Sequence, residues 1–571
     1  MSNERRPDTR SLDTLNGKQK ELDPEYGWKL YQKGLDYDRT LNLFDTVKVN
    51  ENFFIGKQWE GVVSNGLPTP VFNVLKRTCS FIVASITSDN LKVSATPLAA
   101  TANTKALIEP ARIVNEELDA LTERNRIPAL VGEYARNAAV DGDGCLYTYW
   151  DDEEETGQDA KGGIKTEVVE NTRVYFGNPS DRHVQSQPWI IISKRALRGE
   201  VILKAKENNN ADWENIQVND DPTQPDYVKH TDDKVDLCLL FWRDRETKEI
   251  WCYEFTENCT VRKPWSLGIK LYPLVWLNWD YITDSYHGQA MITGLIPNQI
   301  FINKAWAASM LSLLAMAYPK IIYDKTRIRK WDNRVGAAIG TAGDINNAAK
   351  VLEGGNFSPQ IGQFLTLAKT ETESTLGATS VAMGETRPDN TSAIIALQRA
   401  AATPSERTKQ NIYASIEELY RIYVAFMAEY YGKRTVDMEP PEEIKAQYAF
   451  AQQEAPGEVP AKFDFKTLKD MPMTLKLDVG ASSYYSEVAS IQTLSNLLQQ
   501  GAIDVVQFLE RVPDGYVPGR RELINELKQR QQMQAQQAAP VQEAEPEIPT
   551  GGGYSRLQRV INETGTTEGV V

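Results

Sequence analysis

The most constraining feature of this sequence is a long, almost uncharged segment in the middle of the chain. Residues Ala290–Ala317 form a helical candidate with one formal charge, Lys304, and Pro319 sets its end. The longest apolar run within it, Ala305–Tyr318, is shorter than the roughly 20 apolar residues that a membrane-spanning helix needs. The N-terminal residues are polar and contain no apolar core of a secretory signal. We therefore expect a soluble protein without membrane contact.

Charge and cysteine content exclude several classes of protein. The 571 residues are enough for roughly three or four domains. A formal net charge of −15 argues against a protein that coats nucleic acid, because phosphate contacts need a basic surface. The five cysteines form no C-x-x-C pair, so we expect neither a disulfide framework nor a thiolate zinc site. This usage is typical of a reducing compartment.

The chain also lacks the common signatures of enzymes. It contains no G-x-x-x-x-G-K-[ST] phosphate loop and no H-E-x-x-H motif, and we expect its three histidines to be surface or hydrogen-bonded structural residues. Asp141 and Asp143, followed by Asp151–Glu155, form the one candidate for a divalent-cation site. The other ligands of a calcium loop are absent, which favours a turn leading into a strand. We expect no catalytic residue, no metal and no cofactor.

Along the chain, the pattern changes from a mixed domain to long helices. Helical patterns precede residue 141, and short β-branched and aromatic segments follow to about residue 285, which predicts an α+β domain. After the helix at 290–317 come a β-like run at 320–323, a small exposed module at 336–360 and a second helix at about 360–376. No internal repeat is visible.

A third long helix is expected from about residue 391 to Tyr431, with a kink at Pro404. Beyond the kink, apolar residues recur at alternating steps of four and three and form one continuous seam. This seam predicts either core packing within one subunit or an interface between subunits. Its members are Ile412, Ile416, Leu419, Tyr423, Phe426 and Tyr430.

Seven segments, in the right order over roughly residues 45–535, resemble the portal (head-to-tail connector) proteins of tailed bacteriophages. They are Phe53–Trp59, Gly142–Trp150, Tyr286–Gly288, Leu295–Gln299, Ala317–Asp324, Asn390–Ile395 and Asp478–Tyr485. The resemblance implies an α+β, multidomain subunit with an α/β wing, a two-helix stem, a small α/β clip and a helical crown.

The resemblance also gives names and limits to these parts. It implies a wing at 26–285 and 432–480, stem helices at 286–317 and 360–376, and a clip at 318–359. A tunnel loop at 377–390, the kinked helix at 391–431 and a crown at 481–536 complete the plan. The ends, 1–25 and 537–571, are expected to be a flexible N-terminus and a disordered tail.

The function implied by the resemblance is structural. Portal subunits form a ring, typically of twelve copies, at one capsid vertex of the virion, and this ring conducts double-stranded DNA during packaging and ejection. The implied partners are the capsid and scaffold proteins, the terminase large subunit and a head–tail adaptor, with assembly in the cytoplasm of the bacterial host. An acidic conduit suits this role, because phosphates are repelled and DNA slides.

Two groups of residues follow from this layout as candidate sites. The tunnel loop would contact or gate DNA through small or nearly balanced side chains, namely Thr379, Ser380, Met383, Glu385, Thr386 and Arg387. The clip carries a basic patch that is either functional or a set of solvated edge charges. Its residues are Lys320, Lys325, Arg327, Arg329, Lys330 and Arg334.

Two rival classes stay open at this point. One is a different ring-forming head–tail adaptor or channel protein, which should lack the helix–module–helix plan. The other is a metal-dependent nuclease subunit of the packaging machinery, which would need clustered carboxylates for two metal ions. Outside the Asp141 region the sequence contains no such cluster.

Overall fold

The structure is a computed structural model, and it divides into two compact units after Ser482. It describes residues 23–64, 66–88, 91–98, 104–158, 160–221, 233–318, 320–332, 334, 338–352, 359–375, 406–438, 459–471, 473–479, 484–512, 520, 523–524 and 527. Within that part of the chain, no helix has both the length and the apolar character that a membrane crossing requires.

As far as the structure describes it, the N-terminal part of the first unit is mainly helical and contains α2 (Pro24–Thr40), α3 (Leu43–Ile55), α4 (Val74–Thr87), α5 (Thr104–Arg124) and α6 (Ile127–Asp141). Asp23 starts α2 by accepting a hydrogen bond from the Glu25 amide, with Pro24 in the first turn, so the helix begins inside the segment predicted to be flexible. The break between α5 and α6 falls at Arg126, whose φ is 52°, and Pro128 lies in the first turn of α6.

Two antiparallel sheets follow, in the region where the sequence predicted short strands. The three-stranded sheet has the order β3 (Gly163–Val169), β2 (Asp143–Asp151), β9 (Leu274–Asn278). The five-stranded sheet has the order β4-β5-β6-β7-β8. Its strands are Val174–Phe176, Trp189–Leu197, Lys234–Arg243, Ile250–Phe255 and Thr260–Ser266, and helix α7 (Arg198–Glu207) follows β5. The sequence analysis missed β8 and α7, but the α+β class is confirmed.

Two further strand pairs add to the first unit. One joins segments that are far apart in the sequence, and the other lies in a region for which the sequence predicted no strand. Strand β1 (Leu91–Pro97) pairs antiparallel with β16 (Met473–Val479), so the segment near residue 475 returns to the N-terminal part of the same unit. Strand β14 (Lys433–Met438) pairs with β15 (Val459–Asp464). These two strands flank the Pro/Glu-rich segment and were not predicted.

The seam of the third long helix lies in the core. Helix α11 (Glu406–Phe426) continues into a π-helical turn, Met427–Tyr431. The first five seam residues are buried in the main core of their own chain, and Tyr430 packs against that core half-buried. An interface role for these five residues is therefore wrong, because a side chain covered within one chain offers no surface to another. The burial of Tyr430 is partial and does not decide between the two alternatives. Pro404 lies outside the described residues.

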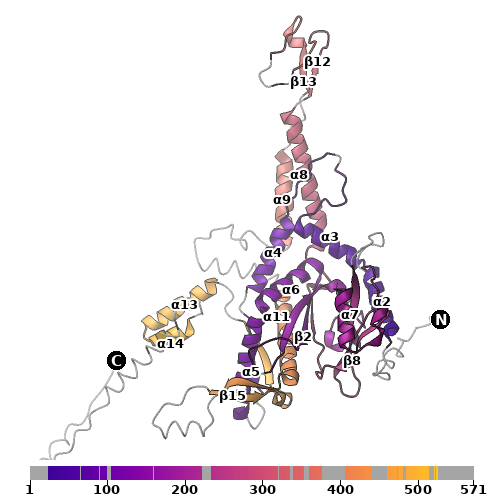
Figure 1. Cartoon of the computed structure of the whole chain (residues 1–571). Helices are drawn as coiled ribbons and strands as arrows, with labels where there is room; N and C mark the ends of the chain where they lie inside the picture. The colour runs from indigo at the N-terminus through magenta and orange to yellow at the C-terminus, as the bar shows by residue number, and fades with distance from the viewer. Residues whose placement is uncertain are drawn as a thin grey trace, which may run out of the picture. The chain divides into compact units, whose positions relative to one another are not determined.

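The structure contains a helix, a small hairpin module and a second helix in the order that the sequence predicted. Helix α8 (Ile296–Ala317) and helix α9 (Pro359–Thr375) lie side by side, and the hairpin of β12 (Lys320–Tyr323) and β13 (Ala349–Leu352) stands between them in the chain (Figure 1). Helix α8 starts later than residue 290 because Pro297 occupies its first turn and a 3₁₀ turn, Thr293–Leu295, precedes it.

The second unit contains two described helices, α13 (Tyr484–Gln499) and α14 (Val505–Arg511). Asp504 and Gln507 form a capping box at the start of α14. The predicted tail, 537–571, lies outside the described residues.

Candidate assembly site: the helical pair and its root

The helical pair α8–α9 exposes an unusual amount of apolar surface. Leu313 and Leu314 in α8 are 56% and 51% exposed, and Phe364 and Leu367 in α9 are 64% and 54% exposed. The apolar side chains of α8 do not gather on one stripe but lie around the helix. A helix of this kind is normally buried on all sides. Within the part of the chain that the structure describes, α8 packs against α4 and α9, but side chains such as Leu313 and Leu314 stay exposed to solvent.

A buried amide network fixes the lower part of α8 to α4. Gln299 is fully buried, and its Oε1 accepts a hydrogen bond from the Val74 amide at 3.1 Å, at the N-terminus of α4. Its Nε2 donates to the carbonyl oxygen of Phe72 at 2.7 Å and to Asn303 Oδ1 at 3.0 Å. Asn303 in turn donates to Gln58 Oε1 at 2.6 Å. One side chain of α8 therefore adds hydrogen bonds to the backbone at the start of α4, where the Val74 amide also donates to the Phe72 carbonyl oxygen at 2.9 Å.

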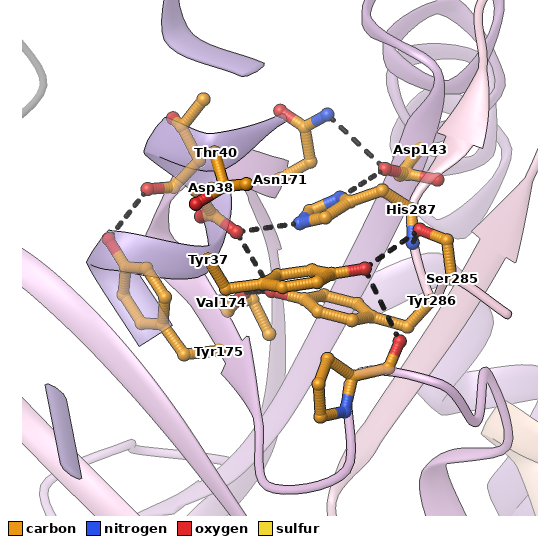
Figure 2. A network of polar contacts seen from close by, with 12 residues as sticks. Tyr37, Asp38, Thr40, Asp143, Asn171, Val174, Tyr175, Ser285, Tyr286 and His287 are labelled. Atoms are coloured by element: carbon orange, nitrogen blue, oxygen red, sulfur yellow. Dashed lines mark hydrogen bonds and ion pairs between the residues drawn. The ribbon is translucent and has the colours of Figure 1, made fainter. Parts of the chain in front are cut away.

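A second polar network lies just before α8, around the buried ring of His287 (Figure 2). Its Nδ1 is 2.7 Å from Asp143 Oδ2, at the start of β2, and its Nε2 is 3.1 Å from Asp38 Oδ1, in α2. Both carboxylates are buried. Tyr37 and Tyr286 stack with ring centroids 5.6 Å apart beside the imidazole. Three segments distant in the sequence thus meet at one cation.

Further hydrogen bonds hold the carboxylate of Asp143 in place. Its Oδ1 accepts the backbone amide of Gly288 and the side-chain amide of Asn278, each at 2.7 Å. Asp38 accepts a weaker hydrogen bond from the hydroxyl group of Tyr286 at 3.3 Å. Residue 288 is a glycine because there is no room for a side chain next to the Asp143 carboxylate. A Cβ at this position would lie 3.1 Å from Asp143 Oδ1 and 2.7 Å from the carbonyl oxygen of Asp280.

The geometry favours a protonated imidazole. A neutral histidine has one N–H and could donate to only one carboxylate, whereas both ring nitrogens here face carboxylate oxygens. Burial alone would lower the pKa of His287, but the hydrogen bonds to Asp143 and Asp38 raise it to about 9. Burial raises the pKa of Asp38. The network is a buried ion pair with a shared cation, which makes it costly to break.

The acidic Asp141–Asp143 segment therefore has a structural use. Asp143 is the first residue of β2, which agrees with the predicted turn leading into a strand. Its carboxylate oxygens accept hydrogen bonds from neighbouring donors. Among the residues that the structure describes, no group of three potential ligands is arranged to hold a metal ion. The prediction that histidines serve as structural or surface residues is confirmed for His287, which is buried in a network, and for His183, which is exposed. His230 lies outside the described residues.

The hairpin module contains the predicted basic patch, and part of this charge is neutralised locally. Arg327 pairs with Asp324 at 3.5 Å, and Arg334 pairs with Asp332 at 2.6 Å. The other four cations are exposed; they are Lys320, Lys325, Arg329 and Lys330. Tyr323 and Trp331 stack with centroids 5.4 Å apart and give the module a small aromatic centre. Two of the six cations are thus held in ion pairs within the module, and four are exposed to solvent.

The predicted tunnel-loop residues lie outside the described part of the chain, and the structure does not place them. They are Thr379, Ser380, Met383, Glu385, Thr386 and Arg387.

Sequence reasoning missed the two polar networks as functional groupings. It used the segments around His287 and Gln299 for the resemblance but gave neither residue a role. The sequence contains one signal: Gln299 and Asn303 are four residues apart in a mainly apolar helix, so they lie on one face. The partners, Asp38 and Phe72, are more than 200 residues away and give no such signal.

Replacing Gln299 by leucine is expected to lower the free energy of unfolding by about 2 kcal/mol, because the hydrogen bonds of its buried amide to Val74, Phe72 and Asn303 would be lost. The measurement is the urea midpoint, compared at equal protein concentration with the wild type. Gln363→Leu, an exposed glutamine of α9, is the matched control and should change the midpoint little. Equal midpoints for both variants would contradict the role given to Gln299.

Comparison with known proteins gives the context of this site. The family model described as phage P22-like portal protein matches residues 204–550, more than half of the chain. The match includes α8, the hairpin module, α9 and α11, together with His287 and Gln299. A search of curated proteins found no match. The chain therefore belongs to the P22-like portal protein family of bacteriophages, whose members are structural components of the viral capsid and act in genome packaging.

Proposed function

We propose that copies of this chain form a closed ring at one capsid vertex and that double-stranded DNA passes through its centre. The single observation that carries the proposal is the apolar surface on α8 that the other described residues leave exposed. Exposed apolar surface of this extent marks a protein contact site. In a member of the portal family, the surface that covers it is another copy of the chain.

The parts of the chain take their roles from this arrangement. Helices α8 and α9 are the stem, and the β12–β13 module is the clip. Residues 26–285 and 432–480 form the wing, 391–431 the kinked helix and 481–536 the crown. The pairing of β1 with β16 supports a wing made of two distant segments. The loop at 377–390 is the part that contacts DNA.

Electrostatics favours passage of DNA over tight binding. A net charge of −15 for each copy repels phosphates, and so limits the number of contacts that would hold DNA in place. The four exposed cations of the hairpin module supply weak, salt-sensitive contacts without sequence readout.

The partners of such a ring are the capsid and scaffold proteins, the terminase and a head–tail adaptor. In this role the chain has no catalytic task and the packaging motor is a separate protein. Family membership favours this function over a different adaptor or a nuclease subunit.

Negative-stain microscopy of the full chain, alone and mixed with the capsid and scaffold proteins of the same phage, tests the proposal. We expect rings with an axial hole. Compact particles without a hole in both preparations would contradict it.

A further inference from the structure

The helical pair has two dissimilar surfaces at one level of α9. The first is a groove of about 560 Å³ between α4, α8 and α9. Its apolar floor includes Phe72, Ile302 and Trp306, and the rings of Phe72 and Trp306 stack with centroids 4.5 Å apart. The second is a ridge formed by the exposed side chains of Phe364, Leu367 and Glu371 on α9.

The groove and the ridge lie on opposite sides of α9. The residues of α9 that line the groove are Gly362, Leu365, Thr366, Lys369 and Glu373. This spacing defines one face of a helix with 3.6 residues per turn. Phe364, Leu367 and Glu371 are also spaced by three and four residues, but their common direction is turned by roughly half a circle from the first face.

The charges on these two surfaces are complementary. At the edge of the groove, the side chains of Arg77 and Lys369 are 50% and 45% exposed, and they hold Glu373 at 3.9 and 3.8 Å. Glu373 itself is almost buried, so the edge presents positive charge to solvent. The ridge ends in the exposed carboxylate of Glu371. An occupant with apolar residues followed by a carboxylate therefore fits the groove.

From these observations we infer that the groove receives the Phe364–Leu367–Glu371 ridge of a second copy of this chain. The inference rests on the proposed ring and assigns the surfaces that build it. Because the two surfaces differ and face opposite ways, the contact is head-to-tail, and each copy can receive one neighbour and enter another.

The groove and the ridge lie at the same position along the axis of α9, which is what closure into a ring requires. The ridge covers about 10 Å along α9, from Phe364 to Glu371, at about 1.5 Å per residue. The groove covers the same stretch of the helix, from Gly362 to Glu373. Copies related by rotation alone, without a shift along the axis, meet at equal heights. Such copies close into a ring, whereas a shift would give an open helix.

Paired cysteines test this contact in the full chain. All five native cysteines are buried, so introduced ones react selectively. In the double variant Phe364→Cys/Thr366→Cys, both changes are at exposed positions, and the two thiols point to opposite sides of one helix, so they cannot join within a copy. A second double variant, Leu367→Cys/Phe72→Cys, tests the apolar floor of the groove.

Under mild oxidation we expect each double variant to give a ladder of disulfide-linked multimers, at least tenfold more abundant than in either single variant. A mixture of the two single variants should stop at dimers, because each copy then carries one introduced thiol and can be linked to one neighbour only. The matched control is Phe364→Cys/Leu203→Cys, in which the second position is an exposed leucine of α7. It should give no ladder.

The outcomes separate this inference from the proposed ring. Rings by microscopy without a ladder from either double variant would overturn the groove–ridge contact and leave the ring standing. Equal cross-linking of the single variants would overturn it as well, because ridge would then meet ridge. Absence of rings in the wild-type chain would overturn both.

Discussion

Replacing His287 by leucine is expected to destabilise the first unit by about 3–5 kcal/mol. The change removes the cation shared by Asp38 and Asp143 and leaves two carboxylates buried without it. The urea midpoint, followed by tryptophan fluorescence, measures the loss. Trp276 is a suitable reporter because its ring centroid lies 5.8 Å from that of His287. The exposed His183 provides the control, and His183→Leu should stay within about 0.5 kcal/mol of the wild type.

The same network predicts a pH dependence of the wild-type chain. The pKa of His287 is about 9 in the folded chain, above its ordinary value of 6.5. The proton is therefore bound more tightly in the folded state, and the stabilisation is complete below about pH 6.5. It is lost as the pH rises through about 9. His287→Leu should lack this alkaline loss, and an identical decline in both proteins above pH 7 would contradict the assignment.

Changing both Leu313 and Leu314 to glutamate is expected to abolish ring formation. Both residues lie exposed on α8, so the isolated chain should fold as before. In the ring they would be covered, and each interface would then bury unpaired carboxylates. Truncated or unpaired charges at interfaces cost about 2–5 kcal/mol, and 1.4 kcal/mol is a factor of ten, so each contact should weaken at least about 30-fold. Because the change recurs at every contact, the ring population should vanish at micromolar concentration.

A matched pair of changes controls for added charge. Leu203→Glu with Val218→Glu also replaces two exposed apolar residues by glutamate, but in the α7 region. This variant should form particles of the same size as the wild type. If the α8 variant keeps its rings while its far-ultraviolet circular dichroism is unchanged, the covered surface is elsewhere.

The elements that the sequence predicted well are those with a strong local period. The β-like run at 320–323 and the second helix near 360–376 match β12 and α9 almost residue for residue, because Pro319 and the apolar spacing mark their ends. Strands β14 and β15, which the sequence analysis missed, depend on pairing and not on a local pattern. β14 and β15 carry charged residues such as Arg434 and Asp437, and they exist because they pair with each other across a long insertion.

The candidate site was predictable only in part. The apolar character of α8 is plain in the sequence, but its exposure depends on what the rest of the chain leaves uncovered. The seam on α11 has the same apolar pattern as an interface, and only the packing of Ile412 and Leu419 into the core distinguishes the two. The Asp38–His287–Asp143 network joins positions more than 100 residues apart, and a single sequence contains no signal for such pairing.

The central claim is that this chain closes into a ring through its helical pair. Native mass measurement of the purified full chain at micromolar concentration, with and without scaffold protein, tests it most directly. The account predicts one dominant species at an integer multiple of 64.2 kDa, with about twelve copies, and its loss in the Leu313→Glu/Leu314→Glu variant. Only monomers or dimers of the wild-type chain under both conditions would contradict it.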